Sequence, residues 1–197
     1  MSVDERMVHD IVQKVMANMQ ISGSVSGMHG VFKDMNDAIN ASIEAQKKVC
    51  TMTLDQREQI ISLIRKKTHE NAEILANMGV NETGMGNVGD KILKHHLTAD
   101  KVPGTEDIST IAWSGDRGLT LVEMGPFGVI GAITPATNPS ETVICNCIGM
   151  LAGGNTVVFN PHPNAKKTTI YTINMINEAS IEAGGPDNIA VTVEAPT

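Results

Sequence analysis

Two proline-bounded loops carry the residue types best suited to binding and polarising a small molecule. The first loop, Thr134-Pro-Ala-Thr-Asn138, ends the apolar run 128–134, and the second, Asn160-Pro-His162, follows the apolar run 155–159. Their hydroxyl, amide and imidazole groups can donate and accept hydrogen bonds. In an open parallel sheet, ligands bind beyond the carboxyl ends of the strands. If the two runs are neighbouring strands, both loops lie at one binding edge.

A glycine-rich segment, Gly84-Met-Gly86-Asn-Val-Gly89, matches the G-x-G-x-x-G spacing of a dinucleotide-binding loop. That function requires a strand leading into the glycines and a helix leaving them, so that backbone N–H groups meet the phosphates. The preceding residues, 71–78, have the composition and period of a helix instead. We therefore interpret the match as a chance one.

The cysteines and histidines predict neither a nucleophile nor a metal site. Cys145 and Cys147 are two positions apart in a helical pattern, so their side chains point about 200° apart, and we interpret both as buried, inert thiols. His95 and His96 are adjacent on a predicted helix with no carboxylate at metal-binding spacing. We expect these two histidines on a solvated helix face.

Helices are predicted to precede the two loops. Apolar residues recur at helical spacing over 32–50, and residues 53–56 have the sequence of a capping box, which opens a second helix over about 53–78. A third helical stretch covers about 90–100. Two β-prone runs separated by a glycine-containing turn then predict a hairpin over 108–124.

The remaining sequence predicts the sheet. The runs 128–134, 155–159 and 188–193 are nearly continuous in apolar residues, which is typical of strands that are covered on both faces. Helical patterns over 143–151 and 170–179 separate them. The predicted fold class is therefore α/β: N-terminal helices, a β-hairpin, and then a βαβαβ part of a Rossmann-like parallel sheet.

The first thirty residues are predicted to lie apart from the domain, which would comprise residues 31–197. Residues 1–20 have apolar positions at helical spacing and polar residues of mixed charge on the opposite face. Residues 21–30 are rich in glycine and serine, which predicts a flexible linker. Two interpretations of the helix remain open: a first helix that folds back onto its own domain, or a docking tag that fits a groove on another protein.

Composition excludes several classes of protein. The net charge is -7, no stripe of Lys and Arg is present, and the aromatic residues are one Trp, one Tyr and three Phe, so nucleic acid is not an expected partner. No run approaches the ~18 to 20 apolar residues that a membrane helix requires, so we expect no membrane partner. Three cysteines without framework spacing favour the cytoplasm.

Several segments together are similar to the aldehyde dehydrogenase superfamily. The strings Ile133-Thr-Pro-Ala-Thr-Asn-Pro139 and Gly154-Asn-Thr-Val-Val-Phe-Asn-Pro-His-Pro163 resemble in particular the CoA-acylating acetaldehyde and propionaldehyde dehydrogenases. Glu82-Thr-Gly-Met-Gly86 resembles the N-terminal region of the same family, so the resemblance covers about residues 31–197. Residues 1–20 resemble the encapsulation peptides that direct such enzymes into bacterial microcompartments, which favours the docking tag.

The resemblance implies oxidation of a short-chain aldehyde by NAD, with CoA as acyl acceptor. In the family, a cysteine thiolate adds to the aldehyde, and a hydrogen-bond donor stabilises the oxyanion. By resemblance, this donor is Asn138 or Thr137; many non-acylating relatives have Pro-Trp-Asn-Phe-Pro here, and ungapped alignment places their asparagine at Thr137. The cofactor-binding candidates by the same resemblance are Thr134, Pro135, Ala136 and Thr137 beside the cofactor and Asn160 and His162 at the ribose.

The resemblance also implies that part of the enzyme lies beyond this sequence. In the family the nucleophilic cysteine comes later than the position of Thr197, and Cys145 and Cys147 do not match its motif. We therefore expect the N-terminal portion of a longer enzyme, inactive by itself. The hairpin over 108–124 resembles the family's oligomerisation strands, which predicts a homo-oligomer, and residues 1–20 predict a shell-protein partner in a microcompartment lumen. The alternative is a noncatalytic cargo protein or nucleotide-binding fragment.

Overall fold

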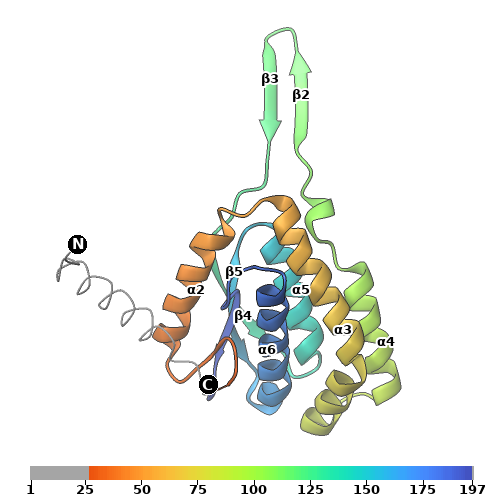
Figure 1. The fold of residues 1–197 in the computed structure, drawn as a ribbon. Coiled ribbons are helices and arrows are strands. Elements are labelled where there is room, and N and C mark those ends of the chain that lie inside the picture. The colour runs from red at the N-terminus through yellow and green to blue at the C-terminus, as the bar shows by residue number, and fades with distance from the viewer. Residues whose placement is uncertain (1–26, 197) are drawn as a thin grey trace, which may run out of the picture.

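A four-stranded parallel sheet lies at the centre of the fold (Figure 1). The computed structural model describes residues 27–196, and the structural statements below concern these residues. The strand order is β1-β6-β5-β4, where the strands are β1 (Val31–Phe32), β4 (Val129–Thr134), β5 (Thr156–Pro161) and β6 (Ala190–Val193). β4 pairs with β5 along its whole length and lies at the edge of the sheet.

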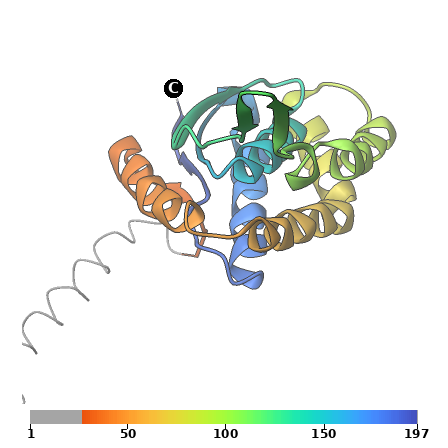
Figure 2. The same cartoon turned by 90° about the horizontal axis from the view of Figure 1, so that it is seen from above.

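Helices cover both faces of the sheet (Figures 1 and 2). Helices α5 (Pro139–Ala152) and α6 (Lys166–Glu182) pack on one face, and α2 (Met35–Val49) packs on the other. The long helix α3 (Leu54–Thr83) packs against α5 and α6. Helix α4 (Val88–Lys101) lies against the outer side of α3 and also reaches the N-terminal part of α5. The helix α4 therefore approaches the carboxyl edge of the sheet.

Side chains of β5 alternate between two apolar cores. Val157 and Phe159 are buried in the larger core, which α3, α5 and α6 complete. Val158 points to the other face, where it packs with Phe32, Val191 and residues of α2. Because both faces are covered, the three successive residues Val157, Val158 and Phe159 are all apolar, which explains the apolar run in the sequence.

The predicted capping box begins α3. Thr53 Oγ1 accepts a hydrogen bond from the Gln56 backbone N–H at 3.2 Å, and Gln56 Oε1 accepts one from the Thr53 backbone N–H at 2.9 Å. The helix continues beyond the expected end near Met78 and ends at Thr83. It ends there because Gly84 adopts a left-handed conformation with φ 68°, which glycine tolerates without strain.

Glu82, close to the end of α3, caps the N-terminus of α6. Its carboxylate accepts hydrogen bonds from the backbone N–H groups of Lys167 at 2.7 Å and Thr168 at 2.8 Å, and from the Thr168 hydroxyl at 2.7 Å. These bonds satisfy donors that the first helical turn leaves unpaired, and the negative charge opposes the positive end of the helix dipole. The carboxylate of Glu82 thus occupies the N-terminal end of α6.

The predicted hairpin is present and projects from the domain (Figure 1). Its strands are β2 (Ile111–Gly115) and β3 (Gly118–Val122), which pair in antiparallel register. Every residue of both strands is exposed in the described part of the chain, including the large apolar side chains of Ile111, Trp113 and Leu121.

The prediction that the first helix begins at Phe32 is wrong. Val31 and Phe32 form the short strand β1, which pairs in parallel with β6, and α2 begins at Met35. The N-cap of α2 is Asp34, whose carboxylate accepts from the backbone N–H of Asn36 at 2.8 Å. A strand of two residues shows no periodicity, so only the sheet beside it reveals the strand.

The last residues of the expected linker belong to the folded domain. The His29 backbone N–H donates to Asn174 Oδ1 at 2.8 Å, and His29 Nδ1 lies 2.9 Å from Asp187 Oδ2. The Gly30 carbonyl accepts from the Thr192 backbone N–H at 2.8 Å. The helix predicted over residues 1–20 and the linker up to residue 26 lie outside the described residues. None of the helices over residues 27–196 is long and apolar enough to cross a membrane.

Candidate functional site

The two polar loops meet at the carboxyl edge of the sheet. Thr134 at the end of β4 is the register partner of Pro161 at the end of β5. The His162 backbone N–H donates to the Thr134 carbonyl at 3.2 Å, so the pairing extends into the second loop. Parallel pairing thus brings together two segments that are far apart in the sequence.

The alternation of β4 divides the predicted site residues between two faces of the sheet. Ile133 and Asn160 are register partners, and both line the face that α2 covers. Thr134 is the next residue along β4, so its side chain points to the opposite face. It is 2% exposed, and its hydroxyl oxygen has no hydrogen-bond partner among residues 27–196.

An apolar groove runs beside β4 on the α2 side. Its volume is about 500 Å³. It is lined by Met35, Ile39, Val129, Gly131, Ala132, Ile133, Val158 and Asn160. Ile133 is 84% exposed although it is a large apolar side chain. Apolar walls with one amide fit a ligand that combines a flat ring with hydroxyl groups. Sequence reasoning identified Asn160 but missed Ile133, whose only signal is its place immediately before Thr134.

A smaller cavity, most of whose lining residues have polar side chains, lies at the turn from β4 to α5. Its volume is about 300 Å³. It is lined by Met85, Gly86, Asn87, Asp90, Lys91, Lys94, Thr137 and Asn138. The glycine-rich segment 84–89 therefore forms a wall of this cavity, between α3 and α4. A helix precedes the glycines, as predicted, which is inconsistent with a dinucleotide-binding loop.

Two lysines of α4 hold this turn in place. Lys91 Nζ donates to the Thr137 carbonyl at 2.6 Å and lies 3.0 Å from Glu141 Oε1. The side chains of this ion pair are only 9% and 5% exposed. Lys94 Nζ donates to Asn138 Oδ1 at 2.6 Å. Sequence reasoning missed both lysines, because their partners lie on α5 and nothing in the local sequence marks the contact.

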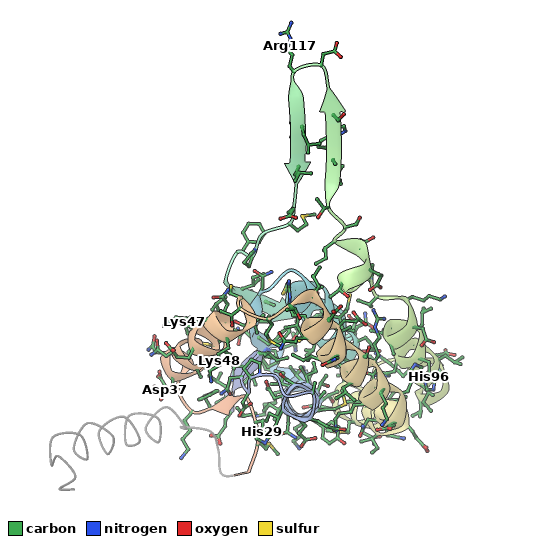
Figure 3. The ribbon with its side chains drawn as sticks, turned by 45° about the horizontal axis from the view of Figure 1, so that its top comes forward. His29, Asp37, Lys47, Lys48, His96 and Arg117 are labelled. Carbon is green, nitrogen blue, oxygen red and sulfur yellow. The ribbon has the colours of Figure 1, made fainter. Side chains whose placement is uncertain are left out.

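The prediction that His95 is solvated is wrong. His95 is fully buried, with Nδ1 2.7 Å from the Lys91 carbonyl and Nε2 2.7 Å from Ser140 Oγ. A carbonyl only accepts, so Nδ1 carries the proton, and Nε2 of the neutral ring is then an acceptor for the Ser140 hydroxyl, which also lies 3.2 Å from Glu141 Oε2. Desolvation lowers the pKa of His95, which favours the neutral ring. His96 of α4 is half-buried (Figure 3). Its ring stacks on that of His69 of α3, with ring centroids 4.8 Å apart.

Burial of neutral His95 predicts a pH-dependent stability. The folded-state pKa lies below the ordinary value of 6.5, so the unfolded chain binds the extra proton first as the pH falls. The contribution of neutral His95 to the free energy of unfolding should therefore have its full value above pH 6.5 and decrease below it. Urea unfolding at pH 7.5 and pH 5.5 measures the difference. The variant His95→Gln should show a smaller decrease, whereas the control His96→Gln should retain it; equal decreases in all three proteins would contradict this assignment.

Neither Cys145 nor Cys147 is an activated nucleophile. Cys147 is buried, as predicted, and burial raises the pKa of its thiol to about 12. Cys145 is exposed, which corrects the expectation that both are buried, but desolvation still raises the pKa of its thiol. Such thiols are protonated at neutral pH. Over residues 27–196, no cluster of three or more His, Cys, Asp or Glu side chains could hold a metal ion.

The other predicted cofactor residues lie at the surface of the two loops. Pro135 and Thr137 are exposed, and Ala136 is half-buried. His162 is exposed, and its Nδ1 accepts a hydrogen bond from the Asn164 backbone N–H at 3.1 Å. One ring nitrogen of His162 therefore caps the following 3-10 turn, and the other remains available to a ligand.

The family model described as the aldehyde dehydrogenase family matches residues 16–195. The chain therefore belongs to the aldehyde dehydrogenase family. This result agrees with the parallel sheet and with the loops at its carboxyl edge.

Individual relatives within the family are acylating enzymes. The chain is 46% identical to the acetaldehyde dehydrogenase (acetylating) of Bilophila wadsworthia over 98% of this chain and 41% of that protein. It is 73% identical to a propionaldehyde dehydrogenase of the Clostridium phytofermentans fucose utilisation bacterial microcompartment, with a TM-score of 0.84 over 86% of this chain and 39% of that one. A Rhodopseudomonas palustris propionaldehyde dehydrogenase, solved with bound CoA and an acylated cysteine, is 47% identical, with a TM-score of 0.83 over 85% of this chain and 39% of that one. The chain thus spans about two fifths of the length of these relatives.

Proposed function

We propose that this chain is the N-terminal, cofactor-side portion of an NAD-dependent, CoA-acylating aldehyde dehydrogenase that converts a short-chain aldehyde and CoA to acyl-CoA. One observation carries the proposal: two binding spaces lie next to each other at the end of β4. They are the apolar groove beside Asn160 and the polar cavity beside Thr137 and Asn138. Hydride transfer requires a nucleotide cofactor and a small carbonyl compound to lie next to each other, and these neighbouring sites support that arrangement.

The groove suits a nucleoside. NAD would supply the hydride acceptor and CoA the thiol that takes the acyl group. Apolar side chains such as Ile133 offer a surface for a flat ring, while the Asn160 amide and the free ring nitrogen of His162 can hydrogen-bond to ribose hydroxyls. The proposed cofactor residues along the intervening edge are Thr134, Pro135, Ala136 and Thr137. Their role in this proposal is to border the cofactor where β4 ends.

The polar cavity suits the carbonyl group of the aldehyde. Negative charge develops on the carbonyl oxygen when a thiolate adds, and an N–H or O–H donor at about 2.7 to 3.1 Å stabilises it. Asn138 and Thr137 both line the cavity and both carry such a donor. None of the three cysteines lines the cavity or the groove. We therefore assign the nucleophilic thiolate to a part of the enzyme outside this sequence.

A chimera tests the proposal. Residues 27–196 would replace the corresponding segment of the C. phytofermentans propionaldehyde dehydrogenase, and NADH formation from propionaldehyde, NAD and CoA would be measured. We expect an active chimera in which Asn138→Ala lowers kcat by about 10² to 10³-fold. Asn160→Ala should instead raise the KM for NAD. The isolated 197-residue chain should form no NADH. An active chimera that is insensitive to both substitutions, or an active isolated chain, would refute the proposed roles.

The alternative function is a noncatalytic cargo protein or nucleotide-binding fragment. It is favoured by one observation: desolvation raises the pKa of the Cys145 and Cys147 thiols, so neither is an activated nucleophile. The intact mass of the protein in its source cells separates the two functions. A mass near 21.0 kDa would favour the cargo protein, and a mass more than twice as large would favour the enzyme.

The enzyme is proposed to work as a homo-oligomer in the lumen of a bacterial microcompartment within the cytoplasm. The exposed apolar hairpin of β2 and β3 would pair with a second copy, and residues 1–20 would bind a shell protein. Support comes from a relative that belongs to a microcompartment. In a second chimera that carries residues 1–196 of this chain, deletion of residues 1–20 should abolish co-purification with shells and leave kcat unchanged. Unchanged co-purification would show that these residues are not the tag.

A further inference from the structure

Asn138 occupies the N-cap position of α5, yet its side chain does not cap the helix. Asparagine is favoured at this position because its side-chain oxygen normally accepts a hydrogen bond from the first helical turn. Here the oxygen is directed to α4, where Lys94 Nζ lies at 2.6 Å and Lys91 Nζ at 3.4 Å. A stabilising cap bond is thus absent, and contacts with two ammonium groups take its place.

These contacts determine which way the amide points. An ammonium group only donates hydrogen bonds, and the amide oxygen is the only acceptor at the end of an asparagine side chain. Rotating the amide by 180° would place its NH2 group against the two positive charges. The oxygen must therefore face the lysines, and Nδ2 must face away from them. Within residues 27–196, the only polar neighbour of Nδ2 is Thr137 Oγ1 at 3.5 Å, too far for a strong hydrogen bond.

The two lysines are held to different degrees. Lys91 is 7% exposed and is fixed by Glu141 and by the Thr137 carbonyl. Lys94 is exposed, and among the described residues its ammonium group bonds only to Asn138. A long, exposed side chain loses conformational entropy when it is ordered in this way. Because this is the only bond of the Lys94 ammonium group among the described residues, we expect Lys94 to affect the cavity through Asn138.

We propose that Lys94 is a positioning residue: with Lys91 behind it, it holds the Asn138 amide so that Nδ2 donates into the cavity to the oxygen of a bound carbonyl compound. This inference rests on the proposed function for the identity of that compound. It also selects Asn138 over Thr137 as the oxyanion donor, because the orientation of Asn138 is fixed by its partners, whereas the Thr137 hydroxyl can rotate.

The first test measures how firmly the Asn138 amide is held, without catalysis. In the 197-residue chain labelled with ¹⁵N-asparagine, the order parameter of the Asn138 side-chain amide should indicate a rigid group. Lys94→Met should lower it below about 0.6, the range of flexible groups. Lys94→Arg should restore order, because the guanidinium also donates to the amide oxygen. Lys101→Met is the matched control, since Lys101 lies on the same helix away from the cavity. An order parameter that does not change in Lys94→Met overturns the proposal.

The second test measures the consequence in the active chimera. Lys94→Met should lower kcat about tenfold and change the KM for aldehyde less than about twofold, as for an interaction made in the transition state. In a chimera that already carries Asn138→Ala, the same substitution should have no further effect. An unchanged kcat, or an equal loss in both backgrounds, overturns the positioning role. An Asn138→Ala chimera with full activity would instead refute the proposed oxyanion donor. The first test would still show, in the 197-residue chain, whether Lys94 holds the Asn138 amide.

Discussion

Replacing Lys91 by methionine is expected to lower the free energy of unfolding by about 3 to 5 kcal/mol. Lys91 and Glu141 form an ion pair of which both side chains are nine-tenths buried, and Lys91 also donates to the Thr137 carbonyl. Removing the ammonium group leaves the Glu141 carboxylate buried without its counter-charge and leaves the carbonyl without a donor. Urea unfolding followed by circular dichroism at pH 7.5 measures the change.

Two controls distinguish the effect of the unpaired buried charge from a general loss of stability. The double variant Lys91→Met with Glu141→Leu should be less destabilised than either single variant, because it leaves no unpaired charge in the interior. Lys47→Met removes an exposed ion pair with Glu44, in which the side chains are 63% and 52% exposed, and should cost less than about 1 kcal/mol. If Lys91→Met cost no more than Lys47→Met, the buried pair would not stabilise the turn between β4 and α5.

Replacing Gly30 by alanine is expected to lower the free energy of unfolding by about 2 to 6 kcal/mol, since backbone strain and overpacking each cost about 1 to 3 kcal/mol. Gly30 has φ 75°, a conformation that residues with a Cβ atom rarely adopt. An added Cβ would also overlap with the Asn177 side chain and the Ala190 carbonyl. The pairing of β1 with β6 should be lost first, which hydrogen exchange of the Thr192 amide would detect.

Gly184 offers a control that isolates the overlap from the strain. Its φ is 77°, and a Cβ added there would meet no atom within 4 Å. Gly184→Ala should therefore show only the cost of the left-handed conformation, about 1 to 3 kcal/mol. Equal destabilisation by the two substitutions would mean that the close packing of Gly30 against Asn177 contributes nothing.

Elements with a strong local signal were predictable from the sequence. The strands β4, β5 and β6 are short apolar runs, and the start of α3 is marked by Thr53 and Gln56, which form the expected capping box. The hairpin follows from two β-prone runs and a glycine turn. In each case the residues that determine the element are within a few positions of one another, so local propensity is sufficient.

Features that depend on distant residues were missed. The strand β1 exists only because β6, at the far end of the described chain, lies beside it. His95 has a polar neighbour on each side in the sequence, which suggests an exposed position. It is buried because α5 packs against it, and Ser140 of α5 provides a hydrogen-bond partner for its ring. Lys91 is an ordinary surface residue by composition until Glu141 is placed 3.0 Å away. Propensity describes a residue's own segment, whereas burial of a charge depends on the segment packed against it.

The candidate site shows the same division. The sequence located Thr134, Asn138 and Asn160 at one edge, because strand ends and proline loops are local features. It did not show that Asn160 of β5 lines the groove, together with its register partner Ile133, while Asn138 lies at a separate cavity. Nor did it show the lysines that contact the Asn138 amide, since Lys94 precedes Asn138 by 44 positions in the sequence and meets it only after folding.

The hairpin and the first described residues lie at opposite ends of the domain. Figure 3 places Arg117, at the tip of the hairpin, and His29, where the described chain begins, at opposite ends. If copies associate through their hairpins, residue 27, where the described chain begins, lies in each copy on the side away from the contact. Every such assembly would then carry one of these ends per copy. Several weak attachments that share one body bind with a much higher effective concentration than a single one, so avidity rather than strong individual contacts could retain such an assembly at a shell.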